Sequence, residues 1–124
     1  MENLEGDPAD SALFNEQVLL ALFEGKRDDA TVLLDVAIME MRLILEKMRR
    51  HIKARDFGGM LLDAVNAQGM AGAMASQTIA EFAARAVRMA ILRKAGEVWM
   101  SCRDMEDTLT QFEAHLKGKD WQIS

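Results

Sequence analysis

Residues 96–118 read GEVWMSCRDMEDTLTQFEAHLKG, and this segment carries the clearest helical pattern in the chain. Its apolar side chains recur at steps of 4, 3, 4, 3 and 4 residues: Val98, Cys102, Met105, Leu109, Phe112 and Leu116. This is the heptad spacing of a helix that packs along one seam. Glu97 at the start and Lys117 near the end suit the helix dipole, and Gly118 is expected to end the helix. The segment predicts a long amphipathic helix with Cys102 buried in the seam.

A second long helix is expected from Asp28 to about Arg55. Its apolar side chains keep a spacing of three and four residues, and three more widen the stripe: Leu34, Ala37, Met41, Ile44 and Met48, with Ile38, Leu45 and Ile52. A stripe this wide predicts a helix that is buried on most sides. Either it is the central helix of a bundle, or a second copy of the protein covers part of it.

Glycines divide the rest of the chain into shorter segments. The first ten residues are acidic and lack a periodic pattern, so we expect a flexible N-terminus over 1–10 and a single helical domain over 11–124. One helix is expected from Ser11 to the turn at Gly25. Gly58 and Gly59 should interrupt the pattern before the next segment begins at Met60.

The glycine pair Gly69 and Gly72 leaves two possibilities open. The segment from Met60 to Gln68 is either separate, or it runs on into a helix with small residues at every fourth position: Gly72, Ser76, Ala80 and Ala84. Rows of small side chains let two helices approach closely. If the helix runs on, this strip is a candidate contact surface.

Composition supports an all-α fold. The chain of 124 residues has one proline and no tyrosine, and it is rich in alanine, leucine and methionine, which favour helices over strands. We expect a compact four- to five-helix bundle with a long central helix. We also expect a homodimer, because the apolar faces exceed what one small interior can cover.

Charge and apolar patterning narrow the functional classes. The net charge of −5 argues against a general nucleic-acid or anionic-membrane binder. The longest apolar run, Val18 to Phe23, has six residues, far fewer than the roughly 20 that span a bilayer. The first basic residue, Lys26, follows six acidic residues, unlike a signal peptide, and Cys102 is the single cysteine. We therefore expect a cytoplasmic protein.

The sequence offers no pattern for catalysis, metal or cofactor binding. Neither His51 nor His115 has a glutamate three residues before it, as di-iron bundles require, and one cysteine with two distant histidines makes no zinc set. Gly69-x-x-Gly72 is too short for a phosphate loop and lacks its lysine. We therefore predict a protein that is not an enzyme and has no cofactor.

By elimination, the sequence favours a protein-binding adaptor, chaperone or regulatory subunit that acts through helix–helix contacts. Ten methionines suit an adaptable apolar surface, and tryptophan is enriched at interfaces. The candidate partner-binding or oligomer-interface residues are Gly72, Ser76, Ala80, Ala84, Trp99 and Met100.

A basic cluster supports an alternative function. The candidate anion contacts are Lys47, Arg49, Arg50, Lys53 and Arg55, which would serve a nucleic-acid-binding regulator. The cluster lacks the aromatic residues that stack on bases, and cations also belong at the C-terminal end of a helix. Nucleic acid is therefore the less favoured partner.

A second alternative comes from residues 114–118. Ala114-His115-Leu116-Lys117-Gly118 resembles the phosphorylated segment of histidine phosphotransfer domains, which are also acidic four-helix bundles. In that family, lysine and glycine follow the histidine by three and four residues, whereas here they follow it by two and three. The resemblance implies a phosphate-accepting role for His115.

Overall fold

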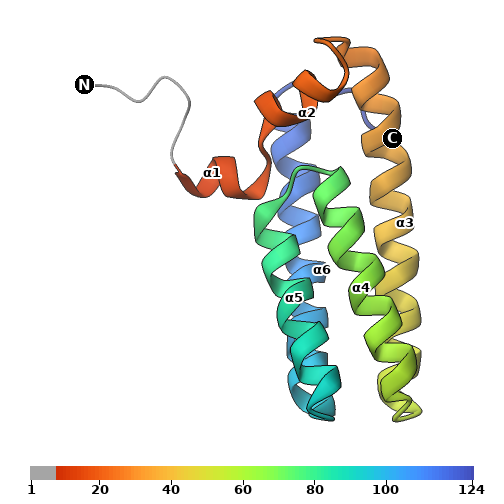
Figure 1. Ribbon diagram of the computed structural model, residues 1–124. Coiled ribbons are helices and arrows are strands. Elements are labelled where there is room, and N and C mark those ends of the chain that lie inside the picture. Colours follow the sequence, from red (N-terminus) through yellow and green to blue (C-terminus); the bar gives the residue numbers. More distant parts are fainter. Residues whose placement is uncertain (1–7) are drawn as a thin grey trace.

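The computed structural model describes residues 8–124, and every regular element in that range is an α-helix (Figure 1). The helices are α1 (Pro8–Leu13), α2 (Glu16–Leu22), α3 (Arg27–Lys53), α4 (Phe57–Ala73), α5 (Gln77–Ile91) and α6 (Ala95–Gly118). The expected all-α fold is confirmed. Of the expected flexible segment, residues 8–10 begin α1, and residues 1–7 lie outside the described range.

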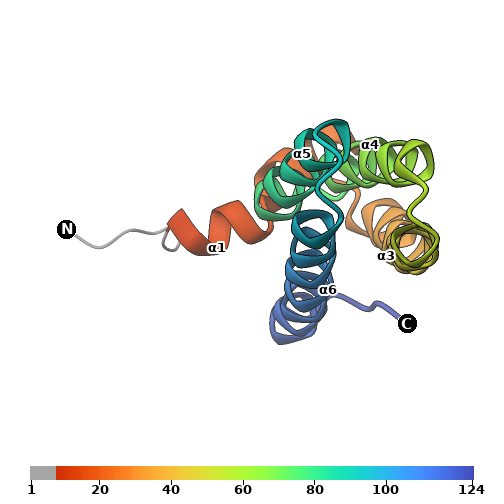
Figure 2. The same ribbon diagram turned by 90° about the horizontal axis from the view of Figure 1, so that it is seen from below.

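The four long helices α3 to α6 form the bundle, and α1 and α2 lie at one end of it (Figures 1 and 2). Each long helix packs beside the next, and α6 closes the ring against α3. The largest fully buried side chains include Leu34, Met41 and Met48 from α3, Met60 from α4, Ile79 from α5, and Met105 and Phe112 from α6. All four helices therefore share one core.

The two long helices largely match their predictions. Helix α6 begins at Ala95 and ends at Gly118, and all six residues of its predicted seam are buried. Helix α3 has 27 residues, as its long apolar pattern predicted. It does not run through the centre of the bundle, however. It occupies one corner, packs against α4 and α6, and leaves its outer face exposed.

The single helix predicted from Ser11 is wrong, because the chain breaks at Phe14 and Asn15. Phe14 is buried and packs edge-to-face against Phe112 and Trp121, with ring centroids 5.4 and 5.6 Å away. The Asn15 side chain accepts a hydrogen bond from the Val18 N–H at 3.2 Å and caps α2. A buried aromatic anchor and a strong N-cap therefore stop α1 and start α2.

The three-residue connections of the bundle share one conformation. In each, the middle residue is left-handed without being glycine: Arg55 (φ 54), Ala75 (φ 56) and Arg93 (φ 57). The N–H of the third residue then donates to a carbonyl in the last turn of the preceding helix, as Asp56 does to His51 at 2.9 Å. This is the Schellman ending of an α-helix. The chain therefore reverses in three residues.

The glycines of α4 lie inside the helix and do not break it. Gly58 and Gly59 belong to its first turn, and α4 runs past Gly69 and Gly72 to Ala73. The predicted interruption exists, but it lies at residues 54–56 and not at Gly58 and Gly59, because Asp56 caps α4 with its side chain 2.9 Å from the Gly59 N–H.

The small-residue strip does not lie on one helix. Gly72 is in α4, whereas Ala80 and Ala84 are in α5, and a turn separates the two helices. Ser76 is the N-cap of α5, and its hydroxyl accepts from the Ile79 N–H at 3.3 Å. Serine favours a helix start over a helix interior, so the run-on alternative is wrong.

Candidate protein-binding surface

The outer face of α3 presents a row of large apolar side chains. Val32, Val36, Met39 and Leu43 keep between 47% and 64% of their surface exposed. They follow one another at steps of 4, 3 and 4 residues, so they lie along one side of the helix. The buried residues of α3 occupy the opposite side. We call these four residues the α3 stripe.

The two ends of the α3 stripe carry opposite charges. Asp28 and Asp29 are exposed in the first turn of α3, before the stripe begins. Lys47 and Arg50 are exposed after it ends, and Arg50 also pairs with Glu46 at 3.3 Å. The acidic end is near the N-terminus of the helix and the basic end is near its C-terminus, as the helix dipole favours.

The outer face of α4 is apolar and uncharged. Leu62 and Val65 are 60% and 50% exposed, and Gly58, Gly69 and Gly72 share their side of the helix. The one charged residue of α4, Asp63, is buried. A Cβ atom placed at either of the later two glycines would meet nothing within 4 Å. We call these five residues the α4 face.

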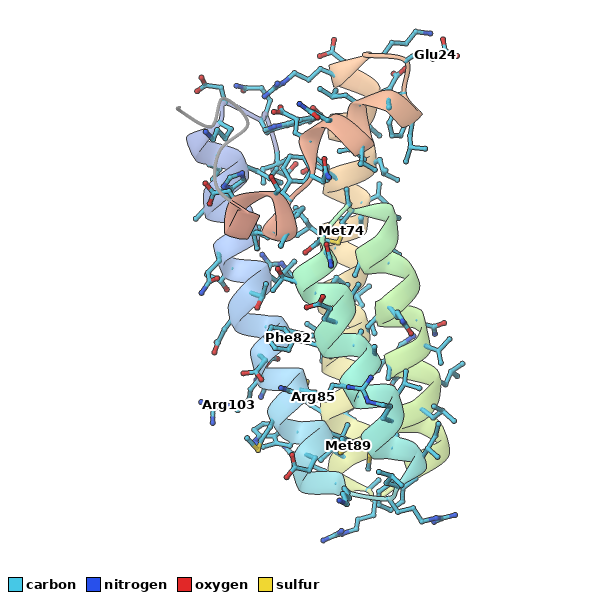
Figure 3. The ribbon with its side chains drawn as sticks, turned by 60° about the vertical axis from the view of Figure 1, so that its left-hand side comes forward. Glu24, Met74, Phe82, Arg85, Met89 and Arg103 are labelled. Carbon is cyan, nitrogen blue, oxygen red and sulfur yellow. The ribbon has the colours of Figure 1, made fainter. Side chains whose placement is uncertain are left out.

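The outer faces of α5 and α6 differ from those of α3 and α4. They carry exposed polar residues such as Gln77, Glu81 and Arg88 on α5 and Arg103 and Asp107 on α6. Figure 3 shows Arg85 of α5 directed toward α6 and Arg103 projecting from the bundle. The Nε atom of Arg85 lies 2.7 Å from the Ser101 hydroxyl, and the guanidinium also pairs with Asp104. These two helices also expose Ile91 and Met100, but α3 with four and α4 with two expose more large apolar side chains.

The structure does not bring the six predicted interface residues together. Gly72 is exposed on the α4 face, whereas Ser76 is buried and Ala80 and Ala84 are half-buried on α5. The remaining two lie on α6, where Trp99 is half-buried and Met100 is exposed. Sequence reasoning anticipated surplus apolar surface on α3 but did not identify its four exposed residues. The heptad spacing of these four residues is the pattern that could have identified them.

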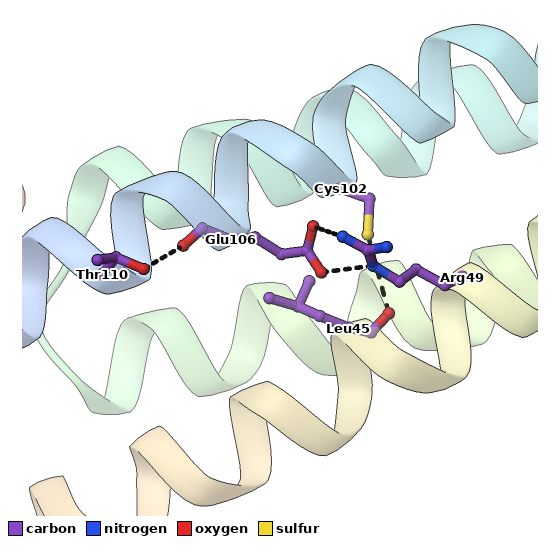
Figure 4. Close-up of polar contacts among 5 residues, drawn as sticks. All are labelled: Leu45, Arg49, Cys102, Glu106 and Thr110. Carbon is purple, nitrogen blue, oxygen red and sulfur yellow. Dashed lines mark hydrogen bonds and ion pairs between the residues drawn. The ribbon is translucent and has the colours of Figure 1, made fainter.

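The predicted basic cluster is partly neutralised within the bundle. Arg49 forms a bidentate pair with Glu106 of α6, with Nε 2.6 Å from a carboxylate oxygen (Figure 4). This hydrogen bond raises the pKa of Arg49. The guanidinium also stacks 5.0 Å from the centre of the Trp99 ring, and Arg50 pairs with Glu46.

Two of the other cluster residues lie at the same end of the bundle as basic residues from a distant part of the chain. Lys47, Lys53 and Arg55 are exposed. The last two lie at the same end of the bundle as Arg93 and Lys94, which are exposed in the connection from α5 to α6. Sequence reasoning missed this pair because about 40 residues separate it from the cluster.

Cys102 lies in the buried seam, as predicted. Its Sγ is 3.8 Å from the Leu45 carbonyl oxygen of α3 (Figure 4). Burial, followed by the negative charge of Glu106, raises the pKa of the thiol to about 12. The thiol is therefore neutral at physiological pH, and reactive cysteines need the opposite shift.

The two histidines have different surroundings. His115 is half-buried near the end of α6, with its ring centroid 6.2 Å from that of Phe14. Nδ1 of His51 lies 2.6 Å from a carboxylate oxygen of Asp63, which is buried. This contact joins α3 to α4, and it was not predicted because the two residues are 12 positions apart.

Residues 8–124 hold no group of three or more His, Cys, Asp or Glu side chains that could bind a metal ion. None of their helices combines the length and the apolar character that crossing a membrane requires. Comparison with protein-family models, curated proteins and solved structures found no match. The exposed surface is therefore the main guide to function.

Proposed function

We propose that this chain is a non-enzymatic protein-binding protein, an adaptor, chaperone or regulatory subunit, which contacts its partners through the outer faces of α3 and α4. The observation that carries the proposal is the α3 stripe together with the α4 face. Six large apolar side chains are about half exposed or more on two adjacent helices, whereas α5 and α6 each expose one such side chain, Ile91 and Met100. Soluble proteins keep contiguous apolar patches small unless a partner covers them.

The α4 face has a shape that suits a partner helix. Leu62 and Val65 stand between glycines, so they project from a backbone that is otherwise bare on that side. A partner helix can approach the glycines closely while its own side chains pack around the two projecting residues. Because the α4 face is uncharged, covering it buries no unpaired ion of α4, and binding avoids that desolvation cost.

The test is capture of partners from the native host by three forms of the protein. Leu62→Ser with Val65→Ser removes the projecting side chains, and Ile91→Ser removes a side chain of similar exposure, 62%, from α5. We expect wild type and Ile91→Ser to retain the same proteins and the double variant to lose them. Retention of the same proteins by all three forms would contradict a role for the α4 face.

Nucleic-acid binding remains the second candidate, because Lys53 and Arg55 lie at one end of the bundle with Arg93 and Lys94. Such a site would hold a labelled duplex at physiological salt and release it as salt rises. Alanine at all four positions would abolish that retention. Two arginines of the original cluster are paired with glutamates, which makes this function less favoured than protein binding.

A further inference from the structure

We infer that the α3 stripe is covered by the α3 stripe of a second copy of this chain, in antiparallel orientation. The inference deepens the proposed function and rests on it, because it names one partner for one of the two apolar faces. Val32, Val36, Met39 and Leu43 have the 4, 3, 4 spacing with which one helix packs along another. All four are exposed although the core of α3 is complete on the other side of the helix.

The charges at the ends of the stripe select the antiparallel orientation. In a parallel pair, Asp28 and Asp29 would face the same two carboxylates of the other copy, and the basic ends would also face each other. In an antiparallel pair, the acidic end of one copy faces Lys47 and Arg50 of the other at both ends of the contact. Like charges at an interface repel and select against the wrong arrangement.

Antiparallel pairing also gives a self-consistent register. A twofold axis between Val36 and Met39 places Val32 opposite the partner's Leu43 and Val36 opposite the partner's Met39. The same register places Asp28 opposite the partner's Lys47, and it places Asp29 opposite the partner's Glu46, which is already paired with Arg50 of its own helix. Each apolar residue then meets an apolar residue, and Asp28 meets a lysine at both ends of the contact.

The length of the stripe predicts the strength of the contact. From Val32 to Leu43 the helix rises about 16 Å at 1.5 Å per residue. One helix face of this length is smaller than the roughly 800 Å² that each partner buries in a standard interface. The dimer is therefore reversible, and at about 100 µM light scattering should report a mass approaching twice 13.9 kDa.

Disulfide cross-linking tests the orientation in a Cys102→Ala background. We expect an equal mixture of Val32→Cys and Leu43→Cys proteins to form a cross-linked dimer under mild oxidation. Val32→Cys alone should not cross-link, because its two copies lie about 16 Å apart along the paired helices. Efficient cross-linking of Val32→Cys alone, or none in the mixture, would overturn the antiparallel arrangement.

Charge reversal tests the pairing without adding cysteine. Asp28→Lys should raise the dimer dissociation constant about tenfold, since it replaces two attractions with two repulsions. Adding Lys47→Asp to the same chain should restore the wild-type value. Asp28→Lys also removes an acidic residue from the start of α3, but the double variant shares that loss, so restoration identifies the pairing. Asp107→Lys on the outer face of α6 is the matched control.

Failure of this inference differs from failure of the proposed function. A monomer at about 100 µM, or equal dissociation constants for wild type and Asp28→Lys, overturns self-pairing through α3. If that monomer still captures host proteins through Leu62 and Val65, the proposed function stands. Loss of both the dimer and the captured proteins overturns both.

Discussion

Gly59 is the glycine whose missing side chain the packing of α3 on α4 requires. A Cβ atom at this position would lie 2.5 Å from the ring of His51. The ring has little freedom to move away, because Asp63 holds its Nδ1 at 2.6 Å. Gly69 lies in the same helix but faces open space. One helix therefore contains a glycine that the fold needs and a glycine that it does not.

The two glycines predict opposite effects of the same substitution. Gly59→Ala should lower the free energy of unfolding by about 1–3 kcal/mol, because overpacking forces the His51 ring or the helix to shift. Gly69→Ala should raise it by about 0.5–1 kcal/mol, since alanine loses less backbone entropy in a helix. Urea denaturation followed by circular dichroism measures both values. Equal effects of the two substitutions would contradict the contact with His51.

Cys102 makes stability depend on pH in the alkaline range. Its pKa rises from the ordinary 9.0 to about 12 in the folded protein, so the folded state keeps a proton that the unfolded state loses. The contribution of the protonated thiol to the free energy of unfolding is complete below pH 9. It declines as pH rises toward 12, by up to about 1.4 kcal/mol per pH unit. Cys102→Ala should lack this component. Parallel stability curves for wild type and variant between pH 8 and 10.5 would show that the thiol is not perturbed.

The same residue should be chemically inert. A thiol reagent at pH 8 should label native Cys102 slowly, because its sulfur is buried and protonated. Labelling should become fast once denaturant unfolds α6. The rate at which the reagent releases its coloured product, measured with and without denaturant, compares the two states. Rapid labelling of the native protein would mean that the seam opens readily.

Among the elements, the short connections between helices contain residues in an unfavourable backbone conformation. A substitution that relieves it should raise the free energy of unfolding. Arg55 is exposed and left-handed between α3 and α4. This conformation costs roughly 1–2 kcal/mol for a residue with a Cβ, whereas fixing a glycine there costs about 0.5–1 kcal/mol in entropy. Arg55→Gly should therefore raise the free energy of unfolding by about 0.5–1 kcal/mol. Arg55→Ala keeps the Cβ and should change it little, so a similar gain from alanine would point to charge as the cause.

The heptad patterns of α3 and α6 were sufficient to predict those two helices, because packing along a seam imposes its spacing directly on the sequence. The positions at which helices end were harder to predict. Phe14 stops α1 because its ring fits between Phe112 and Trp121, a contact that joins residues nearly 100 positions apart. Arg55 occupies a position where glycine is the usual signal, so the Schellman turn could not be located from composition.

The candidate surface was predictable only in outline. The width of the apolar pattern in α3 already indicated more apolar surface than one interior could cover. Which side remained exposed depended on where α4 and α6 pack, and their packing follows from connections that the sequence did not locate. The strip from Gly72 to Ala84 was assigned to one helix because its spacing is regular, although the Ser76 cap divides it.

For the whole molecule, the two tryptophans report on opposite ends of the bundle. Trp99 lies in the second turn of α6 and stacks with Arg49, and Trp121 follows the end of the same helix. Trp121 is buried against Phe14, and the guanidinium of Arg27 lies 4.0 Å from its ring centre. From Trp99 to its end at Gly118, α6 rises about 29 Å. Each tryptophan therefore monitors a different part of the core.

If residues 11–124 fold as one domain, both tryptophans should report the same unfolding transition. We expect the urea midpoint from fluorescence to equal the midpoint from helical circular dichroism in Trp99→Phe and, separately, in Trp121→Phe, since a single domain of this size usually unfolds in one cooperative step. Comparing two signals within each variant removes the effect of the substitution on stability. An earlier fluorescence transition in Trp99→Phe, where Trp121 is the reporter, would show that α1, α2 and the C-terminal residues detach before the four long helices unfold. The shared core argues against this outcome, because Phe112 packs both against Phe14 and within the bundle interior.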